Sequence, residues 1–321
     1  MLSAVFNDDD NWKEFLCRLP DSGVVDTEIG ILKFINKINK WGTNMSDMRS
    51  YDPKLTFEEL GKTISKLGIK KANTKPWQLL LLGILAGLYV SIGGHLFLVA
   101  LNEGAGKIVG GAVFSVGLIL VVIAGAELFT GNVLMLVGAV SRRYSVRKLI
   151  TNWIFVYLGN FIGAMAYTYL VYRAGYFGES TGAFGGVAEI EGMGALVVAV
   201  AGKKLSLSFG SAVIRGIFCN MLVVIAVIMA AMAKDITAKI ICCIVPVMAF
   251  VAIGFEHCIA NMFLIPIGLF VEGASFAGHM AIWGNILPVT IGNIVGGFLI
   301  IFIHPNRIRQ IGSLLKTKKS R

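Results

Sequence analysis

The sequence predicts an all-α polytopic membrane protein with six transmembrane helices, arranged as two inverted three-span repeats with broken second and fifth helices. Three observations support this fold class: the composition, the lengths of the apolar segments and a motif that occurs twice. Of the 321 residues, 56% are apolar and only 15% are charged, and the mean hydropathy is +0.75. A soluble domain is roughly half apolar and a quarter charged. The excess therefore excludes an ordinary soluble protein and favours a chain that crosses a bilayer several times.

Charge and cysteine content exclude further classes of protein. The net charge of +10 does not require a nucleic-acid partner, because loop Lys and Arg residues that fix membrane orientation account for it. The five Cys residues show no CxxC spacing, so we expect neither a metal site nor another cofactor. The polar region 1–76 shows no signal peptide. We expect a cytoplasmic N-terminal region over 1–76, a transmembrane domain over 77–303 and a basic cytoplasmic tail over 304–321.

Six apolar segments follow the polar N-terminal region. The first, third and sixth contain no charged residue and suit single crossings of about 20 residues. The second and fifth are much longer, and as straight helices they would extend about 50 Å, against a hydrocarbon core of about 30 Å. A break in mid-membrane is therefore predicted in both. The segments are Trp77–Leu101, Ile108–Val140, Leu149–Tyr172, Leu205–Ala233, Ile240–Val271 and Met280–Ile303.

The middles of the two long segments share the pattern Gly-x-Glu-x4-Asn, which begins at Gly125 in the first and at Gly254 in the second. The third and sixth segments match as well, through Gly-Asn pairs that begin at Gly159 and Gly292. These two glycines lie 133 positions apart in the sequence, and we call this separation the repeat offset between the two halves. A unit of three spans is therefore used twice. Because three is odd, the second copy enters the membrane from the opposite side, which predicts an inverted repeat with broken helices that meet near the midplane.

The distribution of Lys and Arg predicts the orientation. With six spans, 24 of the 29 basic residues lie on one side, four lie on the other and Arg215 lies within a segment. The positive-inside rule then places both termini in the cytoplasm, with the loop 173–204 outside.

Two broken helices that meet at the midplane imply a path for a solute, because backbone without hydrogen-bond partners is tolerated in a membrane only beside protein or a water-filled cavity. The N-terminal ends of half-helices favour an anion. Glu127 and Glu256 lie at the breaks, and we interpret them, with Asn132 and Asn261 of the same motif, as stabilising the loops. For the carboxylates we expect hydrogen bonds from loop N–H groups. Binding of a cation in transit is the alternative.

His257 is the only histidine at a break. Imidazole donates a hydrogen bond when neutral and exchanges a proton near physiological pH, so it suits an anion that loses its water in a dry constriction. Thr130 lies in the first break and supplies a hydroxyl donor. We predict that these two residues form a central selectivity point.

Charged and apolar residues around the breaks complete the predicted site. Lys203 and Lys204 precede the fourth span, where a lysine would raise the local concentration of anions. Arg215 is either functional or directed towards the outer interface. Constrictions that admit only a small ion are predicted from the apolar residues flanking the breaks, namely Phe114, Leu118, Leu128, Phe129 and Phe250.

Three motifs together resemble the formate/nitrite transporter family. They are Gly-Ala-Glu-Leu-Phe-Thr-Gly-Asn at 125–132, Gly-Phe-Glu-His-Cys-Ile-Ala-Asn-Met at 254–262 and Leu-Pro-Val-Thr-Ile-Gly-Asn-Ile-Val-Gly-Gly at 287–297. The resemblance covers residues 50–305 and implies an aquaporin-like protomer of six spans, assembled as a homopentamer with one pore in each protomer. It also implies passage of small monovalent anions such as formate, nitrite or hydrosulfide through the plasma or inner membrane.

The resemblance assigns roles to individual positions. Thr130 matches the family's loop threonine that faces the central histidine, here His257, and Lys204 matches a lysine of the outer vestibule. Phe129 and Thr130 belong to a loop thought to gate the cytoplasmic side. Asn220 and Asn293 match asparagines of the pore region, and Val223 joins the constriction residues named above. Formate is the first choice of substrate, but Phe218-Cys219-Asn220 is closer to nitrite and hydrosulfide members, which leaves the preferred anion open.

Two other functions and one extra segment complete the predictions. An aquaporin-type facilitator of neutral solutes would carry Asn-Pro-Ala at each break, and neither break contains Pro. A membrane-embedded enzyme is disfavoured, because neighbouring side chains such as Glu256, His257 and Cys258 do not face one another on a helix and no HExxH or GxSxG motif is present. Residues 1–47 have no family counterpart. Within them, 27–41 forms either a helix on the anionic membrane surface or a solvated helix.

Overall fold

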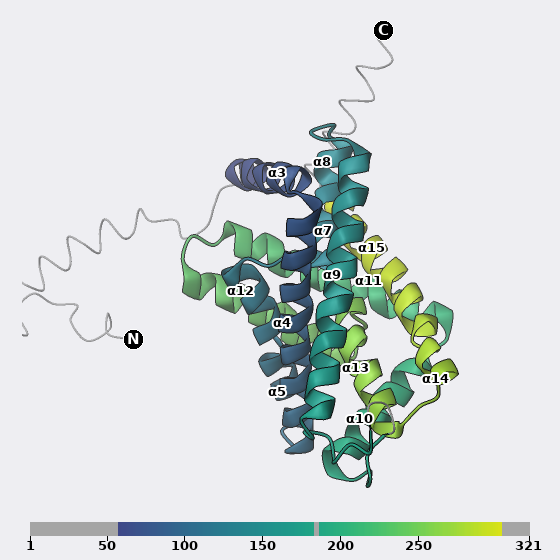
Figure 1. Ribbon diagram of the computed structural model, residues 1–321. Helices are drawn as coiled ribbons and strands as arrows, with labels where there is room; N and C mark the ends of the chain where they lie inside the picture. Colours follow the sequence, from purple (N-terminus) through teal and green to yellow (C-terminus); the bar gives the residue numbers. More distant parts are fainter. Residues whose placement is uncertain (1–56, 183–185, 304–321) are drawn as a thin grey trace, which may run out of the picture. The chain divides into compact units, whose positions relative to one another are not determined.

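The computed structural model describes residues 57–182 and 186–303, all of whose regular elements are helices (Figure 1). The extension 1–47, its predicted helix 27–41 and the tail 304–321 lie outside the described residues. Six helical spans are long and apolar enough to cross a membrane, which confirms the predicted all-α, six-span fold class. They are α4 (Pro76–Asn102), α5 with α6 (Gly106–Phe114 and Val116–Ala124), α9 (Val146–Arg173), α11 (Phe209–Met232), α12 (Ile236–Ile253) and α14 with α15 (Phe276–Met280 and Trp283–Ile303).

Each of the two long apolar segments contains a linker without helical structure. In the first, α6 ends at Ala124, and α7 (Phe129–Asn132), η1 (Val133–Met135) and α8 (Leu136–Val140) follow the linker. In the second, α12 ends at Ile253 and α13 (Cys258–Glu272) follows. Both helices stop at a glycine in the left-handed conformation, with φ of 84° at Gly125 and 88° at Gly254. Residues with a Cβ rarely adopt this conformation, so glycine at these two positions directs the chain out of the helix.

Close crossings of helices tie the spans together. Helix α4 packs along α9, as Figure 1 shows, and α11 packs along α15. A Cβ atom added to Gly163 would lie 2.0 Å from the carbonyl oxygen of Ile84, and one added to Gly296 would lie 2.1 Å from that of Ile217. Glycine is therefore required at both crossings, since small residues let helix backbones approach closely in lipid.

One shorter helix differs from what the sequence predicted. The segment 173–204, expected to be an outer loop, contains most of α10 (Gly192–Leu205). This helix packs against α13, where Gly268 leaves room for Ala201 and the backbone of Val197. The sequence did not reveal this helix for two reasons. Its 14 residues are too few to cross a bilayer, and two lysines near its end are typical of a polar loop. The fourth span accordingly begins at Phe209 rather than at Leu205.

Helix α3 (Phe57–Asn73) lies in the polar N-terminal region and is held against α8 by the loop that follows α8. The Tyr144 ring occupies the space beside Gly68 and Gly138, and its hydroxyl donates a hydrogen bond of 2.5 Å to the Met135 carbonyl. Burial raises the pKa of Tyr144 to about 12, so the hydroxyl keeps its proton and donates throughout the physiological pH range. α3 is thereby fixed beside the first helix break.

Candidate pore site at the two helix breaks

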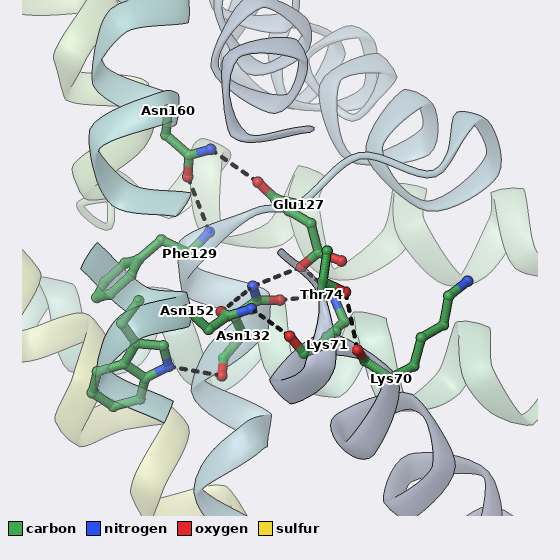
Figure 2. Close-up of polar contacts among 9 residues, drawn as sticks. Lys70, Lys71, Thr74, Glu127, Phe129, Asn132, Asn152 and Asn160 are labelled. Carbon is green, nitrogen blue, oxygen red and sulfur yellow. Dashed lines mark hydrogen bonds and ion pairs between the residues drawn. The ribbon is translucent and has the colours of Figure 1, made fainter. Parts of the chain in front are cut away.

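A network of four polar side chains surrounds the first break. The Lys71 ammonium group at the end of α3 donates to Glu127 Oε2 at 2.6 Å and to Asn132 Oδ1 at 2.8 Å. Asn132 Nδ2 donates to the same Glu127 oxygen and to Asn152 Oδ1. Asn152 Nδ2 in turn donates a hydrogen bond of 3.3 Å to the Lys71 carbonyl oxygen. Figure 2 shows Asn132 between Lys71 and Asn152, so three helices and the linker meet at this point.

Helix α9 also fixes the backbone of the first linker. Asn160 accepts a hydrogen bond of 3.0 Å from the Phe129 N–H group and donates to the Glu127 carbonyl at 2.9 Å (Figure 2). It also donates to the Gly83 carbonyl at 2.9 Å. The Trp153 indole donates to the Asn132 carbonyl. These bonds satisfy backbone groups that the helix break would leave unpaired inside a membrane, where each unpaired group costs several kcal/mol.

The second break has a matching network. Lys204 Nζ lies 3.0 Å from both carboxylate oxygens of Glu256. Asn261 Nδ2 donates to Glu256 Oε2 and to Asn285 Oδ1, at 2.6 and 2.7 Å, and Asn285 donates back to the Lys204 carbonyl. This ion pair is more buried than the first, with side-chain exposures of 14% and 6% against 27% for Lys71 and 13% for Glu127.

The two networks use residues at corresponding positions. The repeat offset that relates Gly159 to Gly292 also relates Lys71 to Lys204, Asn152 to Asn285 and Asn160 to Asn293. Asn293 repeats the bonds of Asn160: it accepts from the Cys258 N–H group and donates to the carbonyls of Gly216 and Glu256. The two breaks are therefore held by the same set of contacts.

The breaks meet through Thr130 and His257. Thr130 Oγ1 lies 2.9 Å from His257 Nε2, and both residues are almost fully buried. His257 is the N-cap of α13, where its Nδ1 accepts a hydrogen bond from the Ala260 N–H group. Nδ1 therefore carries no proton, and in neutral imidazole the proton lies on Nε2 and points to Thr130. The Thr130 hydroxyl hydrogen remains available to another acceptor.

Asn220 connects the pair to the sixth span. Its Nδ2 donates to the Thr130 carbonyl at 3.2 Å and to the Asn293 carbonyl at 2.6 Å. Its Oδ1 is buried and has no hydrogen-bond partner among residues 57–182 and 186–303. The structure thus brings together four polar residues that the sequence singled out, namely Thr130, Asn220, His257 and Asn293.

The predicted constriction residues are all buried, but they occupy different places. Leu118 and Leu128 line an open cavity of about 730 Å³ that also contains Lys71, Glu127 and Asn132. The Phe250 ring lies between Phe114 and the His257 ring, with centroids 6.0 Å from each. Phe129 packs against Trp153 and Tyr157 of α9, and Val223 lies in the core near Asn220 on α11.

Two expectations about the charged residues need correction. The carboxylates of Glu127 and Glu256 accept hydrogen bonds from Lys and Asn side chains rather than from loop N–H groups. Lys204, expected to be an accessible vestibule lysine, is bound to Glu256. Lys71 was overlooked because it lies in a polar segment, although it stands at the repeat offset from Lys204. Arg215 is exposed on α11, and its carbonyl accepts a hydrogen bond of 3.4 Å from the Glu256 N–H group at the second break.

Six apolar spans, two interrupted helices and a buried polar centre between them define a multi-pass membrane channel or transporter. Residues 58–305 match the sequence model of the formate/nitrite transporter family. The chain belongs to the formate/nitrite transporter family, as its motifs indicated.

Individual relatives agree with this assignment. The chain is 39% identical to a probable formate transporter of Methanothermobacter thermautotrophicus, over 76% of this chain and 93% of the relative. It is 35% identical to the formate channel FocA of Escherichia coli, over 75% of this chain and 90% of that protein. Among solved structures, it is similar to a pentameric formate channel with formate bound, with a TM-score of 0.60 and 35% identity over 71% of this chain and 95% of the other.

Proposed function

We propose that the protein conducts small monovalent anions across the membrane, with formate as the first substrate and nitrite or hydrosulfide next, through a path centred on Thr130 and His257. The observation that carries this proposal is the buried contact of 2.9 Å between Thr130 Oγ1 and His257 Nε2, which joins the two breaks. Formate is the substrate named for the relatives, and the preference of this chain among the three anions follows from that similarity.

The hydrogen bonds of the pair fit an anion that sheds its water. The Ala260 N–H group donates to His257 Nδ1, so the ring proton lies on Nε2. Nε2–H then donates to Thr130 Oγ1, and the Thr130 hydroxyl donates to the solute. A buried anion without such a donor would meet a large desolvation cost. The N-terminus of α13 begins beside the pair and adds partial positive charge. Leu118 and Leu128 on one side and Phe114 and Phe250 on the other then act as apolar constrictions.

Proton coupling depends on the same hydrogen bonds. Protonating His257 would place a hydrogen on Nδ1, opposite the Ala260 N–H group and next to the positive end of α13. The neutral ring is thus the resting form. A protonated ring forms only when the first turn of α13 adjusts, and it then pairs with the anion or lends it a proton. Transport coupled in this way increases as the pH falls.

The assembly and orientation follow the family and the charges. We assign the protein to the plasma or inner membrane as a homopentamer with one pore in each protomer, because the solved relative is pentameric. Both termini lie in the cytoplasm, since 24 basic residues lie on that side and four on the other. In this orientation, the cavity beside Lys71 and Glu127 opens to the cytoplasm.

Uptake of labelled formate, nitrite and hydrosulfide into proteoliposomes tests the proposal. We expect saturable uptake of all three anions, and little uptake of glycerol. Empty liposomes and liposomes with heat-denatured protein are the controls. Glycerol or water uptake without anion uptake would contradict anion transport and would indicate a facilitator of neutral solutes.

A further inference from the structure

Arg215 is a charged residue well inside a span, and the polar networks leave its position unexplained. It is the seventh residue of α11 and is exposed, and its guanidinium group has no hydrogen-bond or ion-pair partner in the described part of the chain. A charged side chain within a span is costly unless it reaches water or a partner. Its place therefore implies contact with an aqueous space.

The corresponding residue of the first half indicates which space this is. Leu82 is related to Arg215 by the repeat offset, and the carbonyls of both accept a hydrogen bond from the N–H group of the Glu at the nearby break. Leu82 lines the cavity that contains Lys71 and Glu127. The correspondence predicts that Arg215 lines the opposite mouth, close to Glu256 of the second break. The first half has an apolar residue at this point and the second half has a cation.

The neighbouring lysine does not supply the same charge. Lys204 is part-buried and contacts both oxygens of Glu256 at 3.0 Å, so its positive charge is balanced by that carboxylate. A guanidinium group, by contrast, is always charged and presents parallel N–H donors that match two oxygens of one planar anion. Arg215 is free to offer this geometry to a solute.

We propose that Arg215 forms an outer-mouth binding site for planar monovalent anions with two oxygen atoms, such as formate and nitrite. The inference rests on the proposed anion transport and adds a residue that selects by shape as well as by charge. Hydrosulfide has one sulfur atom and no second acceptor. It gains the attraction of the charge but not the paired hydrogen bonds.

Three variants in proteoliposomes separate charge from geometry. At low ionic strength, Arg215→Gln should raise the half-saturating formate concentration more than fivefold, with little change in maximal flux, because one unit charge near 4 Å in water alone accounts for about fivefold and the paired hydrogen bonds are lost as well. Arg215→Lys should leave hydrosulfide unchanged and raise the value for formate about threefold, as expected when one net hydrogen bond is lost. Lys107→Gln removes an exposed cation far from the breaks in sequence and should change neither value. The Arg215→Gln effect should shrink in 1 M inert salt, where the screening length is about 3 Å.

A binding measurement makes the test independent of transport. Phenylglyoxal modifies arginine, and peptide mass spectrometry measures the modified fraction of Arg215 in the full-length protein. Formate and nitrite should protect Arg215, whereas chloride should not. If the wild type transports formate but neither the protection nor the Arg215→Gln shift occurs, the side chain faces lipid headgroups and the inference is wrong. Protection without formate transport by the wild type would leave the site intact and overturn the proposed function instead.

Discussion

The hydroxyl groups of Tyr157 and Thr290 lie 2.9 Å apart, and the two residues are separated by 133 positions, the same offset that relates Lys71 to Lys204 and Asn160 to Asn293. Corresponding residues of two halves touch each other only where a two-fold relation between the halves passes through the contact. Tyr157 also packs on Phe129, so the contact connects the first residue after the first break to the sixth span. An inverted repeat predicts such a contact between corresponding residues of the two halves.

Tyr157→Phe should destabilise the protein by about 1 kcal/mol, because one hydrogen bond is lost and the packing on Phe129 is kept. Tyr157→Leu should cost more, since the aromatic pair with Phe129, with ring centroids 4.9 Å apart, disappears as well. Thermal unfolding in detergent measures both variants, with Thr290→Val as the partner control. Equal losses for Tyr157→Phe and Tyr157→Leu would show that packing on Phe129 contributes nothing.

Removing one member of a buried ion pair leaves the other charge without a partner. Lys204→Met should therefore lower stability by about 3–5 kcal/mol, and the double variant with Glu256→Gln should recover part of the loss. Lys71→Met should cost less, because the Lys71–Glu127 pair is more exposed to solvent. Thermal unfolding in detergent compares the variants. A larger loss for Lys71→Met would contradict this ranking.

Reversing the charge of Lys204 distinguishes a structural residue from one that attracts anions. Lys204→Glu places a second carboxylate against Glu256, so we expect uptake to fall at every salt concentration, together with the amount of folded protein. A surface charge that attracts anions would instead give a loss confined to low salt, because its field extends about 10 Å at 0.1 M ionic strength. Uptake and size-exclusion profiles measured over a range of salt concentrations decide between the two. If the loss of uptake disappears at high salt, Lys204 acts instead as a charge that attracts anions.

Glycine at the helix crossings should not tolerate a methyl group. Gly163→Ala would place a Cβ 2.0 Å from the Ile84 carbonyl oxygen, so α4 and α9 must separate and the protein should lose stability or fail to assemble. Gly202→Ala in α10 is the matched control, since nothing lies within 4 Å of its added Cβ. Size-exclusion chromatography and thermal unfolding in detergent report both. A Gly163→Ala protein as stable as Gly202→Ala would rule out the close crossing.

The spans and the centre of the site were predictable from the sequence for a physical reason. Hydrocarbon thickness fixes the length of a crossing, so Ile108–Val140 and Ile240–Val271 were visibly too long for one straight helix. The Gly-x-Glu-x4-Asn pattern, which occurs in both long segments, identified the Glu and Asn residues of the two breaks. The same pattern placed Thr130 and His257 within the breaks.

Contacts between distant segments were not predictable in the same way. The partner of Glu127 is Lys71, which lies far away in the sequence at the end of a polar helix, and only the packing of α3 brings them together. Lys204 was recognised, but its pairing with Glu256 arises from α10, which the sequence presents as part of a loop. Hydrophobic pattern identifies a spanning helix, whereas a short helix that packs inside the protein has no comparable length requirement.

The proposed orientation is tested by labelling from outside the cell. Thr181 is exposed in the segment between α9 and α10, which the basic residues place outside. Thr181→Cys should react with a membrane-impermeant thiol reagent in intact cells, and the unsubstituted protein gives the background from its own cysteines. Reaction only after permeabilisation would invert the proposed topology.

The central claim concerns Thr130 and His257, and anion flux in proteoliposomes between pH 5 and 8 tests it most directly. His257→Phe keeps a ring of similar size but removes both nitrogens, so it loses the Thr130 contact and the α13 cap. We expect a strong loss of formate flux and no remaining pH dependence, with the assembly intact by size-exclusion chromatography. Thr130→Val should give a milder loss, and His279→Phe, which removes a histidine of α14 outside both breaks, should keep the wild-type profile. A His257→Phe protein with the rate and pH profile of the wild type would contradict the proposed mechanism.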